Sequence, residues 1–142
     1  MNHLQDAPIF RFPIRVYYAQ SDAAGIVYHA NYLDFMEACR MEWLRAVEID
    51  PIALQHEEGI VFLIRAASLE YLAPARVSDL LMVSAQLKEV GRSRLHIAHE
   101  VWRDETLICK GEVTLVCVHL PTGRSMAVPE AIKNAFMREI VA

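Results

Sequence analysis

Residues 30–47 carry apolar side chains at helical spacing over an unusually wide face. Polar residues such as Asp34, Glu37 and Arg45 fall on the opposite side, together with Met41, as in an amphipathic helix. A helix with so broad an apolar face has to be covered by other elements, so we expect the rest of the chain to wrap around it. The predicted apolar face consists of Tyr32, Phe35, Met36, Cys39, Trp43, Ala46 and Val47.

Most of the remaining chain has the patterns of β-strands. Residues 10–18 alternate apolar with polar side chains, and Pro13, which has no N–H to donate, favours an edge position for this strand. Further strands are predicted for residues 60–71, 80–90, 93–103 and 107–120. Short turn signals separate these four runs, which predicts antiparallel hairpins joined as a meander.

Two shorter helices complete the predicted order, at residues 51–57 and at residues 129–141. The chain has 142 residues, of which 54% are hydrophobic, so residues 1–142 can bury the core of a single domain. We therefore expect an α+β fold in which a long central helix lies against one face of a curled antiparallel sheet of about five strands.

Charge and composition exclude several classes of partner. The formal net charge is −4 and no long basic run is present, which argues against a nucleic-acid partner. The N-terminus lacks a signal-peptide pattern and no apolar stretch is long enough to span a bilayer, so a cytoplasmic protein is expected. The three cysteines are odd in number without metal-ligand spacing, which favours reduced structural thiols.

Residues 21–32, SDAAGIVYHANY, place one carboxylate in a loop of small residues directly before the long helix. The first turn of a helix has unsatisfied N–H groups and a partial positive charge, which stabilise an oxyanion. We expect this turn to begin between Tyr28 and Asn31, with Asn31 and Asp34 as one candidate cap pair. Asp22 beside such a site is the arrangement expected for hydrolysis of an activated acyl group.

The runs FRFPIRVYYAQSDAAGIVYHANYLDFMEACRMEWLR and YLAPARVSDLL resemble the Tol-Pal-associated acyl-CoA thioesterases (YbgC type). These enzymes are relatives of the 4-hydroxybenzoyl-CoA thioesterases and have the hotdog fold. The resemblance implies that Asp22 is the catalytic carboxylate, that the His29 backbone N–H binds the oxyanion, and that Tyr18 is a further site residue. It also implies homodimers or homotetramers with active sites at the subunit interface. Hydrolysis by a carboxylate and a helix N-terminus requires no metal or redox cofactor, so none is expected.

The identity of the thiol carrier determines which basic residues are candidates for substrate binding. Coenzyme A carries phosphates, and Arg92 and Arg94 flank a predicted turn in a position that resembles the basic hairpin of the 4-hydroxybenzoyl-CoA enzymes. Solvated turn arginines are the alternative. Acyl-CoA is the expected substrate, with acyl carrier protein left open as a second carrier. A peripheral association with envelope or phospholipid-synthesis machinery is a further candidate interaction.

Each site residue also has a simpler structural explanation. Asp22 has the features of a turn residue that bonds its own backbone. His29 acts through its side chain or only through its backbone. Tyr18 continues the apolar face of its predicted strand, where packing is its expected role. His96 and His99 fall on opposite faces of one strand, so they cannot share a metal ion.

Two other functions fit the same fold class. One is a hotdog dehydratase or hydratase acting on enoyl or hydroxyacyl thioesters, and the other is a non-catalytic module that holds acyl carriers or scaffolds envelope proteins. The preferred acyl chain, and the choice between nucleophile and general base for Asp22, stay open.

Overall fold

The computed structural model describes residues 2–4 and 6–140. The strands are β1 (Asn2–His3), β2 (Ile9–Arg15), β3 (Ile60–Tyr71), β4 (Leu80–Val90), β5 (Arg94–Arg103), β6 (Thr106–His119) and β7 (Arg124–Ser125). The helices are α1 (Asn31–Ala46), α2 (Pro51–Glu58) and α3 (Glu130–Phe136), with a 3-10 turn at Tyr18–Gln20. The order of elements agrees with the sequence prediction, and the bounds of β3 and β4 match it to the residue.

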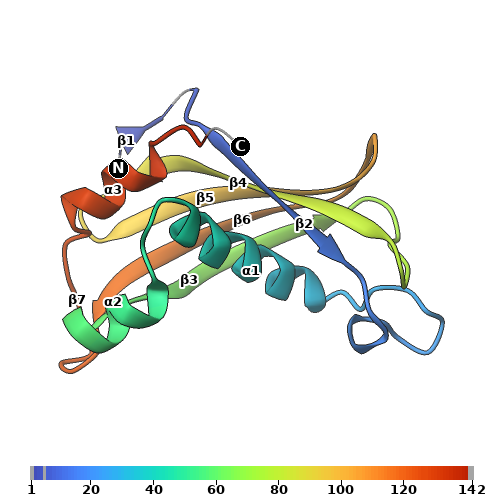
Figure 1. Cartoon of the computed structure of the whole chain (residues 1–142), viewed down its shortest axis with the longest axis horizontal. Helices are drawn as coiled ribbons and strands as arrows, with labels where there is room; N and C mark the ends of the chain where they lie inside the picture. Colours follow the sequence, from blue (N-terminus) through green and yellow to red (C-terminus); the bar gives the residue numbers. More distant parts are fainter. Residues whose placement is uncertain (1, 5, 141–142) are drawn as a thin grey trace.

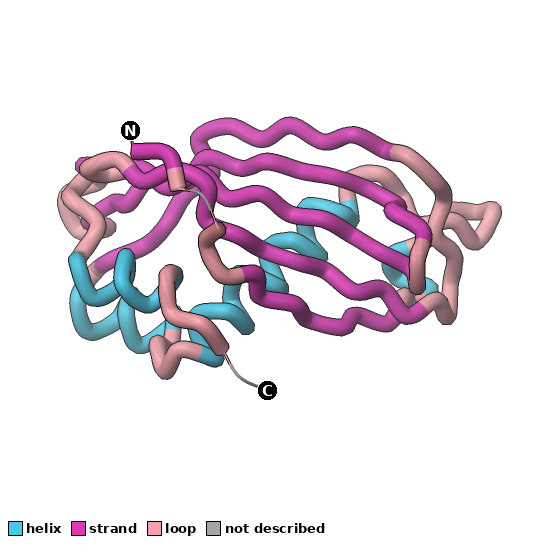
Figure 2. Tube along the Cα trace, turned by 90° about the horizontal axis from the view of Figure 1, so that it is seen from above, coloured by secondary structure: helices cyan, strands magenta, loops and turns pink. Residues whose placement is uncertain are grey.

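One curled antiparallel sheet wraps around α1 (Figures 1 and 2). The long strands lie in the order β2, β4, β5, β6, β3, with the short β1 beside β4 and β7 beside β6. The expected α+β architecture, a long helix covered by five long strands, is therefore confirmed. Pro13 lies on β2, which pairs with β4 alone among the described strands. The edge position that this proline predicts is therefore confirmed.

The predicted meander is wrong at its first step, because β3 and β4 do not form a hairpin. β3 pairs with β6, whereas β4 pairs with β2 and β5. The connection at residues 72–79 carries the chain from β3 at one edge of the sheet to β4, the strand next to β2 at the opposite edge (Figure 1). Backbone bonds hold this crossing, since the N–H of Val16 donates to Asp79 (2.9 Å) and the N–H of Val27 donates to Ala75 (2.9 Å).

The predicted apolar face of α1 is buried, with one exception. Ala46 is exposed, and its place on the buried face is taken by Leu44. Arg40 also lies on this face and is only 8% exposed, although it is not among the residues of the predicted face. The remaining predicted face residues are all buried in the core: Tyr32, Phe35, Met36, Cys39, Trp43 and Val47.

The first long strand ends earlier than predicted, at Arg15. Its pairing stops where Arg15 meets Leu80 at the start of β4, and the chain then enters the 3-10 turn at Tyr18–Gln20. Tyr18 is 83% exposed, so the prediction that it packs on the apolar face of a strand is wrong.

The two short helices have clear end signals. Asp50 caps α2, since its Oδ1 accepts from the N–H of Ile52 (2.9 Å) and of Ala53 (3.4 Å). Gly59 ends α2 with a φ of 68°, a left-handed conformation that favours glycine. The C-terminal helix α3 is shorter than predicted, and Val141, the predicted last residue, lies outside the described residues.

Candidate active site

Asp22 lies at the base of a tight hairpin that precedes α1. The N–H of Asp22 donates to the Ile26 carbonyl (2.8 Å), and Ser21 forms a β-bridge with Val27. Asp22 Oδ1 accepts from the backbone N–H of Ala24 (2.8 Å) and of Ile26 (3.2 Å). One carboxylate oxygen therefore braces the loop, while Oδ2 has no hydrogen-bond partner among the described residues and the side chain is exposed.

The start of α1 is tied directly to this hairpin. The Gln20 carbonyl accepts from the side-chain amide of Asn31 (2.8 Å) and from the backbone N–H of Tyr28 (2.9 Å). Ala30 is the N-cap residue and makes no side-chain cap bond, so the candidate cap pair of Asn31 and Asp34 is wrong. The Asn31 side chain fixes the distance between the helix start and the Asp22 loop instead.

Two adjacent backbone N–H groups at the helix start are left without acceptors. Within the part of the chain that the structure describes, the N–H groups of His29 and Ala30 make no hydrogen bond, whereas that of Asn31 donates to the Tyr28 carbonyl (2.9 Å). These free donors coincide with the positive end of the α1 dipole. The helix start can therefore accept an anion or a developing oxyanion.

A cavity of about 390 Å³ opens at the same place. The Tyr71 hydroxyl at the end of β3 donates to the His29 carbonyl (3.1 Å). The Tyr71 ring also packs edge-on against Tyr32, with centroids 5.6 Å apart. The cavity is lined by His29, Tyr32 and Tyr71 and by Ile26, Val27, Leu72, Ala73 and Pro74.

The other predicted site residues lie elsewhere. Of the predicted site residues only His29 lines this cavity, and neither Asp22 nor Tyr18 does. Arg94 pairs with Val116, which pairs with Leu63 near the start of β3, whereas His29 contacts Tyr71 at the other end of β3. The arginine turn is thus about 25 Å away along the sheet, at the end that carries α2 and α3 (Figure 1). Within one chain, Arg92 and Arg94 are not brought to Asp22.

The core contains a buried polar pair that the sequence does not predict. Arg40 Nη1 on α1 lies 3.1 Å from His99 Nε2 on β5, and His99 Nδ1 lies 2.9 Å from the Ser84 carbonyl. His99 is 1% exposed, and burial together with the Arg40 charge lowers its pKa to about 3. The imidazole is therefore neutral, with Nδ1 donating to Ser84 and Nε2 accepting from Arg40.

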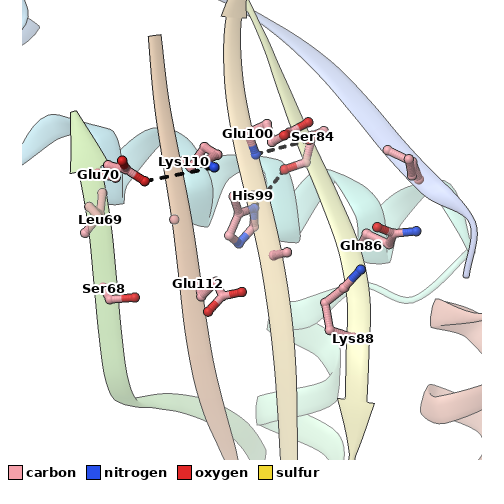
Figure 3. A pocket seen from close by; sticks show the side chains of 13 residues that line it. Ser68, Leu69, Glu70, Ser84, Gln86, Lys88, His99, Glu100, Lys110 and Glu112 are labelled. Carbon is pink, nitrogen blue, oxygen red and sulfur yellow. Dashed lines mark hydrogen bonds and ion pairs between the residues drawn. The ribbon is translucent and has the colours of Figure 1, made fainter. Parts of the chain in front are cut away.

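A second hollow, of about 470 Å³, lies on the face of the sheet that points away from α1 (Figure 3). Its charges are mixed, and Glu70 and Lys110 approach to 4.0 Å across it. This hollow contains none of the predicted site residues. Among the described residues, no group of three or more His, Cys, Asp or Glu side chains is arranged to hold a metal ion. No described helix is both long and apolar enough to cross a membrane.

Comparison with known proteins places these features in a family. The sequence profile of the thioesterase-like superfamily matches residues 16–136. The chain is 35% identical over 127 residues to the acyl-CoA thioesterase YbgC of Haemophilus influenzae, covering 89% of this chain and 93% of the relative. It is 37% identical over 129 residues to the acyl-CoA thioester hydrolase YbgC of Escherichia coli O6:H1, covering 90% and 96%.

Solved structures give the same fold. A 1,4-dihydroxy-2-naphthoyl-CoA thioesterase from Synechocystis superposes with a TM-score of 0.83 at 23% identity, covering 90% of this chain and 95% of that one. A hypothetical protein from Thermus thermophilus superposes with a TM-score of 0.80 at 28% identity, covering 89% and 95%. The hotdog fold is thereby confirmed, and the chain belongs to the thioesterase-like superfamily and, within it, to the family of the YbgC acyl-CoA thioesterases.

Proposed function

We propose that this protein hydrolyses acyl-CoA thioesters, with Asp22 as the reacting carboxylate and the start of α1 as the oxyanion site. The observation that carries the proposal is that one short segment, residues 22–30, has both a free carboxylate oxygen and free N–H groups. Asp22 Oδ2 has no hydrogen-bond partner among the described residues. The His29 N–H likewise donates to no acceptor among them. The similarity to YbgC thioesterases supports the choice of acyl-CoA as substrate.

The reaction follows from these two groups. The thioester carbonyl oxygen accepts from the His29 N–H, which stabilises the negative charge that develops as the tetrahedral intermediate forms. Asp22 attacks the carbonyl carbon directly, giving a mixed anhydride that water hydrolyses, or it takes a proton from the attacking water. In both routes the C–S bond breaks, the thiolate leaves and is protonated, and the products are a free acid and a thiol.

The arginine turn joins the same site if two copies pair through β3. In an antiparallel pair of identical strands, the Ile60 end of one strand lies beside the Tyr71 end of the other. Such a twofold arrangement brings the Arg92–Arg94 turn of the second copy to the end of the molecule that carries Asp22. The nucleotide phosphates of acyl-CoA then meet two guanidinium groups that one chain alone holds far from Asp22.

A hydratase or dehydratase is the main competing function, and one substrate separates the two. Crotonyl-CoA offers both a thioester for hydrolysis and a double bond for hydration, so release of free thiol and loss of the enoyl chromophore are followed in the same sample. We expect thiol release without hydration. Hydration without thiol release would refute the proposal, as would tight acyl-CoA binding with no turnover of short, long or aromatic acyl groups.

A further inference from the structure

The His29 carbonyl has an unusual hydrogen-bond partner for its position. His29 directly precedes the N-cap residue Ala30, so its carbonyl lies outside the hydrogen-bond ladder of α1 and needs a donor from elsewhere. The Leu33 N–H donates to the Ala30 carbonyl (3.2 Å), and no backbone N–H of the described residues donates to the His29 carbonyl. The Tyr71 hydroxyl, from a strand 42 residues further along the chain, supplies the donor at 3.1 Å.

Holding this carbonyl also aims the next N–H group. The peptide bond between His29 and Ala30 is planar and trans, so its C=O and N–H point in opposite directions. A hydrogen bond that fixes the His29 carbonyl on one side therefore fixes the Ala30 N–H on the other. That N–H has no acceptor among the described residues, and it neighbours the equally free N–H of His29.

Tyr71 is well placed to keep this orientation. Its ring packs edge-on against the buried Tyr32 ring (5.6 Å) and against the His29 imidazole (6.4 Å). The ordinary pKa of tyrosine, about 10, keeps the hydroxyl protonated at neutral pH, and partial burial and the neighbouring Cys109 raise the pKa of Tyr71 further, so it remains a donor. The donor is thus fixed before substrate arrives, which is the condition for electrostatic stabilisation without reorganisation.

We infer that Tyr71 is a positioning residue, which holds the Ala30 N–H as a second oxyanion donor beside that of His29. The inference rests on the proposed thioester hydrolysis and adds to it a residue that acts through the backbone of another segment. Because Tyr71 touches the far side of the peptide plane, its loss should weaken stabilisation of the transition state rather than binding of the substrate.

The test replaces Tyr71 by Phe and compares it with a matched variant, Tyr28→Phe. Both tyrosines are 49% exposed and both rings contact His29, but the Tyr28 hydroxyl makes no hydrogen bond to the described residues. Each change removes only a hydroxyl group and keeps the aromatic ring. We expect kcat of Tyr71→Phe to fall about 5- to 10-fold with KM unchanged, the effect of one lost hydrogen bond. Tyr28→Phe should keep kcat within about twofold of the parent.

Other outcomes are equally informative. A Tyr71→Phe enzyme with the kcat of Tyr28→Phe would overturn the inference, and so would a change confined to KM. A thermal melt of both variants shows whether the fold is retained, and a kcat loss that is accompanied by an equally large loss of folded protein would also count against a positioning role. Asp22→Asn, assayed in parallel, separates the proposed function from the role of Tyr71. Full turnover of Asp22→Asn would refute the proposed function. An inactive Asp22→Asn beside a Tyr71→Phe enzyme with normal turnover would refute only the role of Tyr71.

Discussion

The two oxygens of the Asp22 carboxylate have different environments. Oδ1 accepts both loop N–H groups, from Ala24 and Ile26, whereas Oδ2 has no partner among the described residues. The structural explanation of Asp22 as a turn residue and its proposed chemical role are therefore compatible, because they use different atoms. An asparagine at this position retains Oδ1 as an acceptor and loses only the charge.

For His29, we predict that the backbone matters more than the imidazole. The side chain is exposed and its nitrogens make no hydrogen bond to the described residues, whereas the N–H is at the helix start. His29→Ala keeps that N–H, so turnover of acyl-CoA should stay within about tenfold of the parent in steady-state assays. A loss as large as that of a charge-removing change at Asp22 would instead assign the chemistry to the imidazole.

At this scale the sequence predicts residues that act within one short segment. Asp22 and His29 are predicted because they share a motif before a recognisable helix. Tyr71 and the Arg40–His99 pair were not found, because their partners lie 42 and 59 residues away and depend on strand order. Arg40 did carry a signal, since it follows Met36 by four positions and so shares the apolar face of the helix.

Between elements, the contact of α1 with β5 includes the only buried ionisable pair that bridges helix and sheet in the described part of the chain. Arg40 is held by neutral His99, which in turn donates to the Ser84 carbonyl on β4. Protonating His99 would place a second positive charge beside Arg40 and remove its acceptor. The pair therefore links folding to pH.

The sign of this linkage follows from the pKa of His99, about 3 in the folded protein against 6.5 as its ordinary value. Above pH 6.5 the imidazole is neutral in both states and has no effect. Between pH 6.5 and 3 the unfolded chain binds a proton that the folded chain excludes, so stability falls as pH falls. Between pH 7 and pH 5 this amounts to about 2 kcal/mol.

We predict that His99→Gln removes most of this acid sensitivity. Glutamine can still accept from Arg40 and donate to Ser84, but it does not titrate. Urea unfolding at pH 7 and pH 5 should show the parent losing about 2 kcal/mol more than the variant. Equal losses in the two proteins would mean that His99 is protonated in the folded state or that other groups set the pH dependence.

Element bounds were easier to predict than element pairing. The bounds of β3 and β4 follow from apolar runs that turn residues interrupt, which are local features. The crossing at residues 72–79 is not local, because it depends on hydrogen bonds to Val16 and Val27 far earlier in the chain. A short connection with turn residues therefore resembles a hairpin, although it joins strands that are not neighbours in the sheet.

For the whole molecule, the open feature is the outer edge of β3. No described strand pairs with that edge, and Leu63 and Ile64 on it are 49% and 45% exposed. An exposed apolar edge strand favours pairing with another copy. We predict that light scattering at micromolar concentration gives at least twice the chain mass of 16.1 kDa. A monodisperse species near 16.1 kDa would contradict this.

The arginine turn at residues 92–94 gives a prediction about the proposed dimer. If Arg92 and Arg94 of a second copy hold the nucleotide phosphates, replacing both by Ala should raise KM for acyl-CoA, and added salt should raise KM of the parent. A short thioester that lacks the nucleotide is the control, and its KM should barely change. Equal losses on both substrates would assign the turn to folding or assembly.

Turnover of Asp22→Asn tests whether Asp22 is the reacting carboxylate. The substitution preserves side-chain shape and the Oδ1 acceptor that braces the loop, and it removes the negative charge and basicity of the free oxygen. Steady-state hydrolysis of an acyl-CoA should fall by about 10² to 10⁴, while the melting temperature stays at or above that of the parent. Near-normal turnover with a lowered melting temperature would contradict the account and leave Asp22 as a turn residue alone.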